Sequence, residues 1–531
     1  MSQLNVHIKH AGRIHDVQLN IDQPPTVFKD AIYQVTGVPP ERMKVMIKGG
    51  LLKDDHDWRK VAPKEGQTFM VIGAAGELPK PPPQPIVFME DMEDAELAQA
   101  LALPVGLVNL GNTCYMNATL QAMRAIPELQ TALDASSSTG LPSSLKALYS
   151  EMSRTTDEVT PFAFLSALRQ AFPQFAEIAR PQSGMKGLYA QQDAEECWVQ
   201  LTNALRDVPG LPGPSGSNSS GQKFVEQYMT GVMCRELKCT DPEAAAEPPS
   251  ITSEKVLKIE CNITISTNYM HTGILDALNG TIEKNSPSLG REAAYSSKSR
   301  LARLPSYLTV HMVRFAWRRD ISKKAKIMRR VKFPLEFDAL DIVTDDLKEK
   351  LLPVNTKLKV VDKDRAERRK IRKRSKGVTQ ATQPSENGES ATAPEAAAND
   401  QSADNVGAIP EERVARAEEL QQLEALINPD LKNDTGCSVT GLYDLVAIVT
   451  HKGAAADAGH YMAYVKKSAF HPVSHDGASA DKRAIDEEDE DWYKFDDDKV
   501  SVFPKEKIAT LDGGGEDSSA YVLLYKSKPL A

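Results

Sequence analysis

The chain has 531 residues, of which 41% are hydrophobic and 26% are charged, a balance typical of a folded protein with more than one domain. Its formal net charge of −9 disfavours general binding to nucleic acid and is compatible with a neutral or basic protein partner. The apolar runs at 443–450 and 520–525 are far shorter than a membrane span, so we expect no membrane contact. The N-terminal sequence lacks the apolar core of a secretory signal.

The cysteines are sparse and irregularly spaced, at Cys114, Cys197, Cys234, Cys239, Cys261 and Cys437. This usage is typical of reduced thiols, so we expect a cytoplasmic protein, with the nucleus as a possible second location. A four-cysteine zinc site needs two close pairs, and only Cys234 and Cys239 approach such a pair. We therefore expect no metal and no cofactor.

Residues 1–76 are expected to form a self-contained domain. Apolar residues alternate with polar ones in two short segments, which predicts two strands joined by a turn at 11–12. A helix capped by Thr26 should follow, and then strands at 44–48 and 68–72. The order predicts a small mixed sheet packed on one helix.

The segments 44–55 (KVMIKGGLLKDD) and 67–73 (QTFMVIG) resemble ubiquitin-like domains, a resemblance that implies a β-grasp fold. Strand alternation directs Met46, Met70 and Ile72 away from the helix. An outward apolar patch on so small a domain suits docking to a protein, and ordinary surface scatter is the alternative.

A proline-rich linker at 77–102 should connect this domain to a second one, at 103–531. Residues 363–410 begin with basic residues and continue with polar ones, which predicts a disordered insertion, and a helix from 410 to about 427 should end it. The basic run 363–376 is either a nuclear import signal or a solvated linker. A second polar insertion is expected at 468–491.

The segment 106–121 (GLVNLGNTCYMNATLQ) carries the strongest chemical signal. Helical spacing after the Gly-Asn-Thr turn places Cys114 in the first turn of a helix, where the helix dipole and free N–H groups stabilise a thiolate. Asn109 precedes the cysteine by five residues and could direct its amide at an oxyanion. A cysteine at a helix start is more often structural, and that alternative stays open on these grounds alone.

A cysteine nucleophile needs a base, and the base needs a group that orients it. His460 follows a glycine-bearing loop and opens a short strand, so it can face a cleft. Asp496 ends the strand formed by WYKFD and could accept a hydrogen bond from the imidazole. A surface histidine and a solvated acidic turn are the alternatives.

Five segments together resemble the ubiquitin-specific protease family of deubiquitinases, in the family's order: 106–121, 191–196 (QQDAEE), 307–315 (YLTVHMVRF), 459–465 (GHYMAYV) and 492–501 (WYKFDDDKVS). The resemblance implies an α+β fold, with a papain-like cysteine protease core and a β-rich extension. It makes Cys114 the nucleophile, His460 the base, Asp496 its orienter and Asn109 an oxyanion donor. The 191–196 box is expected to support the structure beneath the site.

A ubiquitin-like domain ahead of this core is similar to the proteasome-associated members of the family. That similarity implies ubiquitin and polyubiquitin conjugates as substrates, docking of the N-terminal domain on the proteasome regulatory particle, and loops at 316–330 and 452–458 that cover the ubiquitin-tail channel. Two alternatives remain: a non-catalytic ubiquitin-binding scaffold, and an allosteric regulator of the proteasome.

Overall fold

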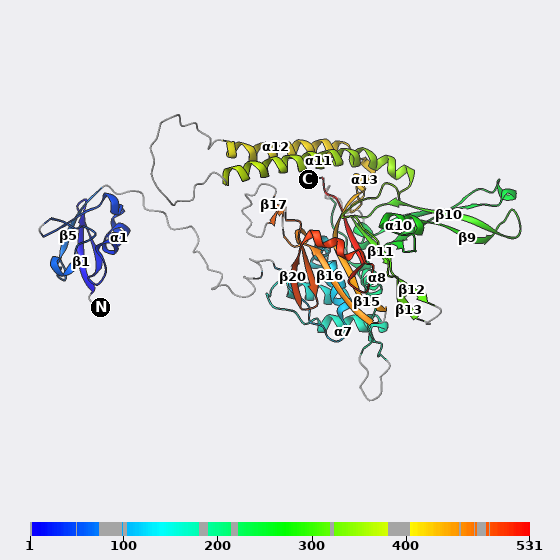
Figure 1. Cartoon of the computed structure of the whole chain (residues 1–531), viewed down its shortest axis with the longest axis horizontal. Coiled ribbons are helices and arrows are strands. Elements are labelled where there is room, and N and C mark those ends of the chain that lie inside the picture. Colours follow the sequence, from blue (N-terminus) through cyan, green and yellow to red (C-terminus); the bar gives the residue numbers. More distant parts are fainter. Residues whose placement is uncertain are drawn as a thin grey trace. The chain divides into compact units, whose positions relative to one another are not determined.

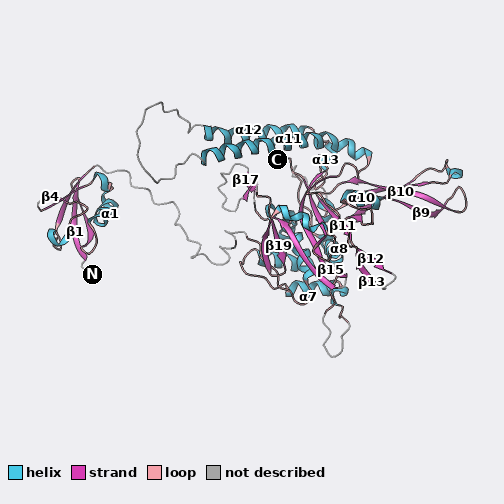
Figure 2. Ribbon diagram, in the orientation of Figure 1, coloured by secondary structure: helices cyan, strands magenta, loops and turns pink. Residues whose placement is uncertain are grey.

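The computed structural model describes residues 3–48, 50–73, 98, 103–179, 189–213, 221–318, 323–380, 404–455, 458–471, 473–474, 485–487 and 489–530. The chain divides into two compact units, Met1–Asp91 and Met92–Ala531, which are described in turn (Figure 1). Figure 2 shows a strand-rich N-terminal unit and a C-terminal unit that mixes helices and strands.

The N-terminal unit is a five-stranded mixed sheet with one principal helix. The sheet order is β2-β1-β5-β3-β4, with β1 parallel to β5. The elements are β1 (Gln3–His10), β2 (Arg13–Asn20), α1 (Pro25–Thr36), β3 (Lys44–Ile47), β4 (Gly50–Leu51), α2 (Trp58–Val61) and β5 (Thr68–Ile72). This order confirms the predicted succession of strands and helix.

Helix α1 begins at Pro25 rather than after a Thr26 cap, because proline is pre-set for the first helical position. Phe28 and Ile32 are buried against the sheet, and the Phe28 ring meets Phe69 edge-on at 5.5 Å. Val27 lies at the margin of this face and is 42% exposed.

The C-terminal unit opens with a layer of helices that packs against a large sheet. The helices of this layer are α4 (Cys114–Met123), α5 (Pro127–Ala135), α6 (Leu141–Met152), α7 (Phe162–Ala171), α8 (Ala194–Ala204) and α9 (Phe224–Tyr228). Helix α4 is buried along its whole length, so its first residue is held firmly against the sheet.

The large sheet has the order β20-β19-β16-β15-β21-β11-β8 along its main path. These strands are β8 (Ile259–Asn262), β11 (Tyr307–Val313), β15 (Leu442–Ala455), β16 (Ala458–Lys466), β19 (Trp492–Asp496), β20 (Lys499–Phe503) and β21 (Ser519–Ser527). Both faces are buried: Tyr461 and Ala463 face the helical layer, and Met462 and Tyr464 face a second core. Alternation along β16 therefore fixes which side chains reach the helices.

A second sheet, of order β7-β6-β10-β9, forms the β-rich extension. Its strands are β6 (Gly231–Cys239), β7 (Ser250–Val256), β9 (Asn279–Asn285) and β10 (Glu292–Arg303), with α10 (Met270–Leu278) beside them. Figure 1 shows β9 and β10 projecting from the body of the unit. The helical layer, central sheet and extension fit the papain-like architecture with a β-rich extension.

Two long antiparallel helices, α11 (Asp345–Gln380) and α12 (Asp404–Ala425), lie beside the main body, and the short α13 (Pro429–Asn433) follows (Figure 1). The expectation of disorder throughout 363–410 was therefore wrong at both ends, and 381–403 lies outside the described residues. Lys, Arg and Glu are good helix formers, and the basic side chains find acidic partners across the helix pair. Arg365 and Arg368 meet Glu419 and Glu412 at 2.8 and 2.9 Å.

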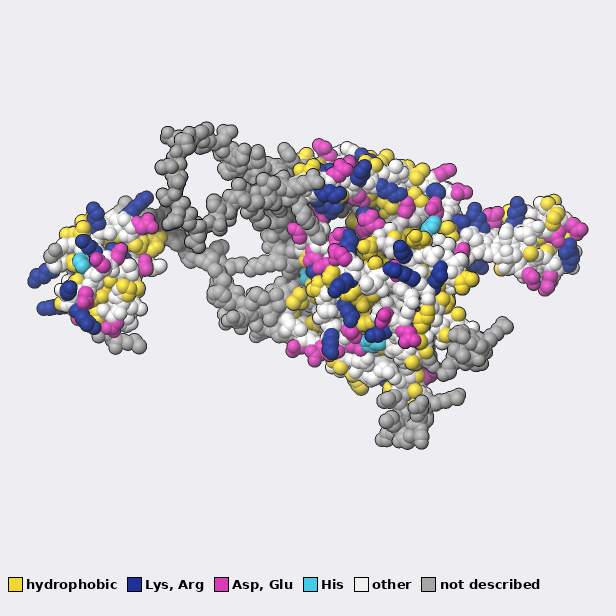
Figure 3. All heavy atoms as spheres, in the orientation of Figure 1, with side chains coloured by type: hydrophobic (Ala, Val, Ile, Leu, Met, Phe, Trp, Pro, Cys, Tyr) yellow, Lys and Arg dark blue, Asp and Glu magenta, His cyan; other side chains and the backbone are white. Residues whose placement is uncertain are grey.

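The visible face of the C-terminal unit carries Lys and Arg interspersed with Asp and Glu (Figure 3). Among the residues that the structure describes, no helix is both long and apolar enough to cross a bilayer.

Candidate active site

Cys114 is the first residue of α4 and is 3% exposed. The loop before it turns sharply, with Gly111 and Asn112 at φ of 94° and 54°. The Asn109 side-chain oxygen stabilises this turn by accepting hydrogen bonds from the Gly111 N–H at 2.9 Å and from the Thr113 hydroxyl at 3.2 Å. The sulfur therefore sits at the N-terminal end of a helix, where the dipole favours a negative charge.

His460 and Asp496 come from neighbouring antiparallel strands, β16 and β19, and are 36 positions apart in the sequence. The His460 Nε2 lies 2.6 Å from Asp496 Oδ1, and Lys494 Nζ donates to the other carboxylate oxygen at 3.0 Å. Since Asp496 occupies Nε2, the Nδ1 atom of His460 is left for Cys114. Asp496 thus contacts His460 directly, and Cys114 lies close enough to His460 to affect its pKa.

The hydrogen bond with Cys114 is the main reason that the pKa of His460 rises from 6.5 to about 9. Burial opposes this rise, and the hydrogen bond to Asp496 adds to it. Burial also disfavours a charge on Asp496, but the hydrogen bonds from His460 and Lys494 outweigh it and lower the pKa of the carboxyl group. The arrangement favours a charged imidazole beside an ionised Asp496 carboxylate.

Asp497 joins the cysteine loop to the acidic turn, a role that sequence reasoning missed. Its carboxylate accepts hydrogen bonds from the side-chain amides of Asn109 and Asn117, each at 2.8 Å. Its backbone adopts φ of 54°, in the left-handed region that aspartate tolerates better than most residues. The run of three aspartates was the available signal, but it did not indicate which acid faced the histidine and which faced the cysteine loop.

Gly106 permits the two segments to approach. A Cβ atom at this position would collide with the backbone of Asp498, so a larger residue would separate the cysteine loop from the acidic turn.

Comparisons with known proteins show the family of the chain. The family model described as ubiquitin carboxyl-terminal hydrolase (UCH) matches residues 105–525. The chain is 40% identical over 527 residues to ubiquitin carboxyl-terminal hydrolase 6 of Schizosaccharomyces pombe, covering 99% of both chains. It is 36% identical over 536 residues to ubiquitin carboxyl-terminal hydrolase 6 of Arabidopsis thaliana, covering 98% of both. It is also 29% identical over 536 residues to ubiquitin carboxyl-terminal hydrolase 14 of Caenorhabditis elegans, covering 98% of this chain and 93% of the relative.

The chain belongs to the ubiquitin carboxyl-terminal hydrolase family. It is a cysteine-type deubiquitinase, as the five sequence segments implied. The relatives match along nearly its whole length, including the N-terminal unit.

Gln191 is a further residue of the hydrolase site that sequence reasoning assigned only to structural support. Its side-chain amide donates to the Gly459 carbonyl at 2.9 Å and lies 4.0 Å from the Cys114 sulfur. The residue before His460 is therefore bonded to the segment that precedes α8.

The two segments expected to cover the ubiquitin-tail channel form paired strands where the structure describes them. Strands β12 (Phe315–Arg318) and β13 (Lys323–Lys326) make a hairpin, and Ala325 pairs with Ala455 at the end of β15. Lys326 is buried, and its ammonium group donates to the carbonyls of His451 and Asp517 at 2.9 and 3.1 Å. Residues 319–322 and 456–457 lie outside the described residues.

Three other cysteines of the hydrolase lack the surroundings of a nucleophile. Burial raises the pKa of the thiols of Cys197, Cys261 and Cys437, to about 12 for the last two. Cys234 and Cys239 lie on one strand, β6, and no group of metal-binding side chains occurs in the described part of the chain.

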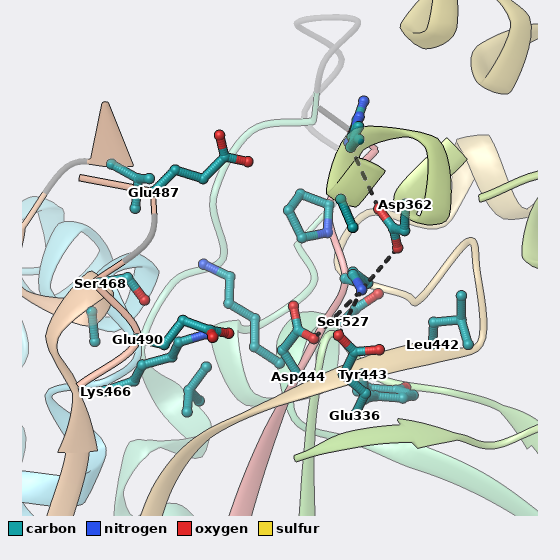
Figure 4. A pocket seen from close by; sticks show the side chains of 18 of the residues that line it. Glu336, Asp362, Leu442, Tyr443, Asp444, Lys466, Ser468, Glu487, Glu490 and Ser527 are labelled. Carbon is teal, nitrogen blue, oxygen red and sulfur yellow. Dashed lines mark hydrogen bonds and ion pairs between the residues drawn. The ribbon is translucent and has the colours of Figure 1, made fainter. Parts of the chain in front are cut away.

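A charged cavity of about 750 Å³ lies elsewhere in the C-terminal unit, between α11, α12 and the end of β21 (Figure 4). Lys528 fills part of it and meets Asp362 and Glu336 at 2.8 and 3.3 Å. Neither Cys114 nor His460 lines this cavity.

The predicted patch on the N-terminal unit is exposed. Met46, Met70 and Ile72 are 40%, 50% and 52% exposed, and Met46 and Met70 are direct cross-strand neighbours on β3 and β5. Leu51, which is 43% exposed and pairs with Met46, extends the patch onto β4.

Proposed function

We propose that this deubiquitinase releases ubiquitin from conjugates held at the proteasome, and that Cys114, His460, Asp496 and Asn109 carry the reaction. The observation that best supports the catalytic roles is the contact of 2.6 Å between His460 Nε2 and Asp496 Oδ1, together with the interaction with Cys114 that raises the pKa of His460. Acyl transfer by a thiol requires a nucleophile next to a base, and a third group that orients the base.

In the proposed reaction, the Cys114 thiolate attacks the carbonyl carbon of the last glycine of ubiquitin. The developing oxyanion is stabilised by the free N–H groups at the start of α4. Asn109 donates one amide N–H to Asp497, and an amide carries two such donors, so the second can serve the oxyanion.

His460 then gives its proton to the leaving lysine amine, and a thioester forms between Cys114 and ubiquitin. Water attacks the thioester while His460 accepts its proton, and the thiolate is regenerated. Asp496 holds the imidazole in the required orientation throughout.

The apolar patch on the N-terminal unit, formed by Met46, Leu51, Met70 and Ile72, is the proposed docking surface for the proteasome regulatory particle. Its four side chains are contributed by three adjacent strands, so they form a continuous exposed apolar surface.

The hairpin β12–β13 and the end of β15 are the proposed covers of the ubiquitin-tail channel. Their pairing at Ala325 and Ala455 means that they would move together when a docking event opened the channel. We propose a cytoplasmic location, since all six cysteines are free.

The proposed function is tested by turnover of a proteasome-bound polyubiquitin conjugate. Cys114→Ala should stop release of ubiquitin while ubiquitin binding persists. Continued release by this variant would refute the assignment, and so would equal turnover of proteasome-bound and free conjugates by the native chain.

A further inference from the structure

His451 is a buried histidine with no apparent chemical task. It is fully buried on β15, and neither ring nitrogen has a hydrogen-bond partner among the described residues. Burial lowers the pKa of this imidazole to about 4, with Lys326 and His460 nearby adding to the effect, so the ring is neutral at ordinary pH. An unsatisfied polar ring inside a protein is costly, so its position calls for a reason beyond packing.

The ring of His451 is held in an aromatic setting. It meets Phe315 edge-on at 5.0 Å and Tyr461 at 4.9 Å. Its backbone is fixed as well, because the buried ammonium group of Lys326 donates to its carbonyl at 2.9 Å. The imidazole ring is therefore held in one position by its aromatic neighbours and by its anchored backbone.

Gly459, the residue directly before His460, lies next to the His451 ring. A Cβ atom at Gly459 would lie 2.5 Å from the Nε2 of His451 and would also collide with the Lys452 carbonyl. The φ of Gly459 is 149°, a backbone conformation that favours glycine. The His451 ring and the Lys452 carbonyl thus leave no space for a side chain at Gly459.

A second contact fixes Gly459 through its carbonyl group. Gln191 donates its amide to the Gly459 oxygen at 2.9 Å, and the same amide nitrogen lies 4.0 Å from the Cys114 sulfur. The glycine is therefore restrained by a ring that occupies the space of a side chain and by a hydrogen bond on its oxygen.

We propose that Gln191 and His451 are positioning residues that clamp Gly459 and thereby fix His460 against Cys114. The inference rests on the proposed pairing of Cys114 with His460. In it, His451 acts by its volume and its lack of charge, and Gln191 acts by its hydrogen bond. Neither residue exchanges a proton during the reaction.

The experiment measures alkylation of Cys114 by iodoacetamide in the full-length chain, from about pH 5 to about pH 10, because alkylation reports the thiolate. Turnover of a fluorogenic ubiquitin substrate is measured alongside. His451→Ala should empty the space next to Gly459. We expect kcat to fall by roughly 10- to 100-fold while KM changes less than about threefold. The pH profile of Cys114 alkylation should move to higher pH. His451→Leu, which keeps a similar volume without nitrogens, should recover most of both signals.

Gln191→Met keeps the length of the side chain and removes its donor, and should lower kcat by roughly tenfold. In the double variant His451→Ala with Gln191→Met the losses should be less than multiplicative, because both contacts act on one glycine. Thermal unfolding of every variant separates loss of positioning from loss of folding.

Native alkylation and kcat in folded His451→Ala would overturn the clamp. A His451→Leu protein that folds but is as impaired as His451→Ala would overturn it too, since the ring nitrogens would then carry the role. His460→Ala, which removes the histidine itself, should give the largest shift in the pH profile of Cys114 alkylation. If that variant keeps the native profile, the Cys114–His460 pairing itself fails, a result distinct from failure of the clamp.

Discussion

Asn109 and Asp497 lie 388 positions apart in the sequence, and the Asn109 amide donates to the Asp497 carboxylate at 2.8 Å. The same carboxylate binds Asn117 on α4. These bonds tie the loop that carries Cys114 to the turn that carries Asp496. The distance between nucleophile and histidine therefore depends on Asp497.

Replacing Asp497 with Ala should remove both bonds, leaving the Asn109 amide without this acceptor and the Asn117 amide bonded only to backbone carbonyls. We expect a loss of about 1–3 kcal/mol in the free energy of unfolding and a larger proportional loss of kcat than of substrate affinity. Chemical denaturation and steady-state kinetics measure these effects. Asp498→Ala is the matched control because this neighbouring side chain is exposed, and an equal effect there would contradict the role of Asp497.

The charge on His460 should depend on Cys114. In Cys114→Ala the hydrogen bond that raises the pKa of His460 is lost, so we expect the pKa to fall from about 9 toward 6.5. NMR titration of the histidine ring measures it. A pKa that stays near 9 in the variant would show that Cys114 is not the cause.

The same shift has a consequence for stability. A pKa raised on folding stabilises the native state fully below 6.5, and this contribution is lost as the pH rises through about 9. As the pH rises from 6.5 to about 9, the free energy of unfolding should therefore fall less in Cys114→Ala than in the native chain. Chemical denaturation at several pH values measures the difference.

The ion pairs between α11 and α12 should contribute to stability. Glu412 is buried and bonds Arg368 and Arg416 at 2.9 and 2.8 Å. Burial opposes ionisation of Glu412, but the hydrogen bonds from these arginines outweigh it and lower the pKa of this carboxyl group below 4.5. Glu412→Gln should lower the free energy of unfolding by about 1–3 kcal/mol at neutral pH.

This loss should shrink in acid. A lowered pKa stabilises the folded state above 4.5, and the contribution disappears as the pH falls through the folded value. Glu418→Gln, at an exposed position of the same helix, is the control and should have little effect. A pH-independent loss in Glu412→Gln would mean that the charge of Glu412 is not what stabilises the helix pair.

The apolar patch of the N-terminal unit predicts a separable docking function. The double variant Met46→Glu with Met70→Glu should fold normally, because both side chains are exposed, and should bind the proteasome at least tenfold more weakly. Its turnover of free substrate should be unchanged. Ile14→Glu alters an exposed residue on β2, at the other edge of the sheet, and should bind normally. Undiminished binding by the double variant would place the docking surface elsewhere.

Sequence patterns predicted the parts of the molecule whose physics is local. Strand alternation in β3 and β5 correctly predicted that Met46, Met70 and Ile72 are exposed, because a strand places successive side chains on opposite faces. The helical spacing after Cys114 correctly placed it in a first turn.

Patterns failed where distant segments meet. The basic stretch after Lys363 was expected to be disordered, but part of it is helical and Arg365 and Arg368 pair with acids more than 40 positions away. The hydrogen bonds of Asp497 and Gln191 likewise span a long stretch of sequence, and no local periodicity encodes them. The contact between His451 and Gly459 depends on the register of β15 and β16, which the residue order alone does not specify.

The most direct test of the account is the covalent reaction of the full-length chain with a ubiquitin that carries a thiol-reactive group at its C-terminus. Intact-mass analysis with and without proteasome, followed by peptide mapping, identifies the modified residue. We predict a single adduct on Cys114 that forms with proteasome and is absent from Cys114→Ala. An adduct on another cysteine, or no adduct in either condition, would contradict the central claim that Cys114 is the nucleophile of this deubiquitinase.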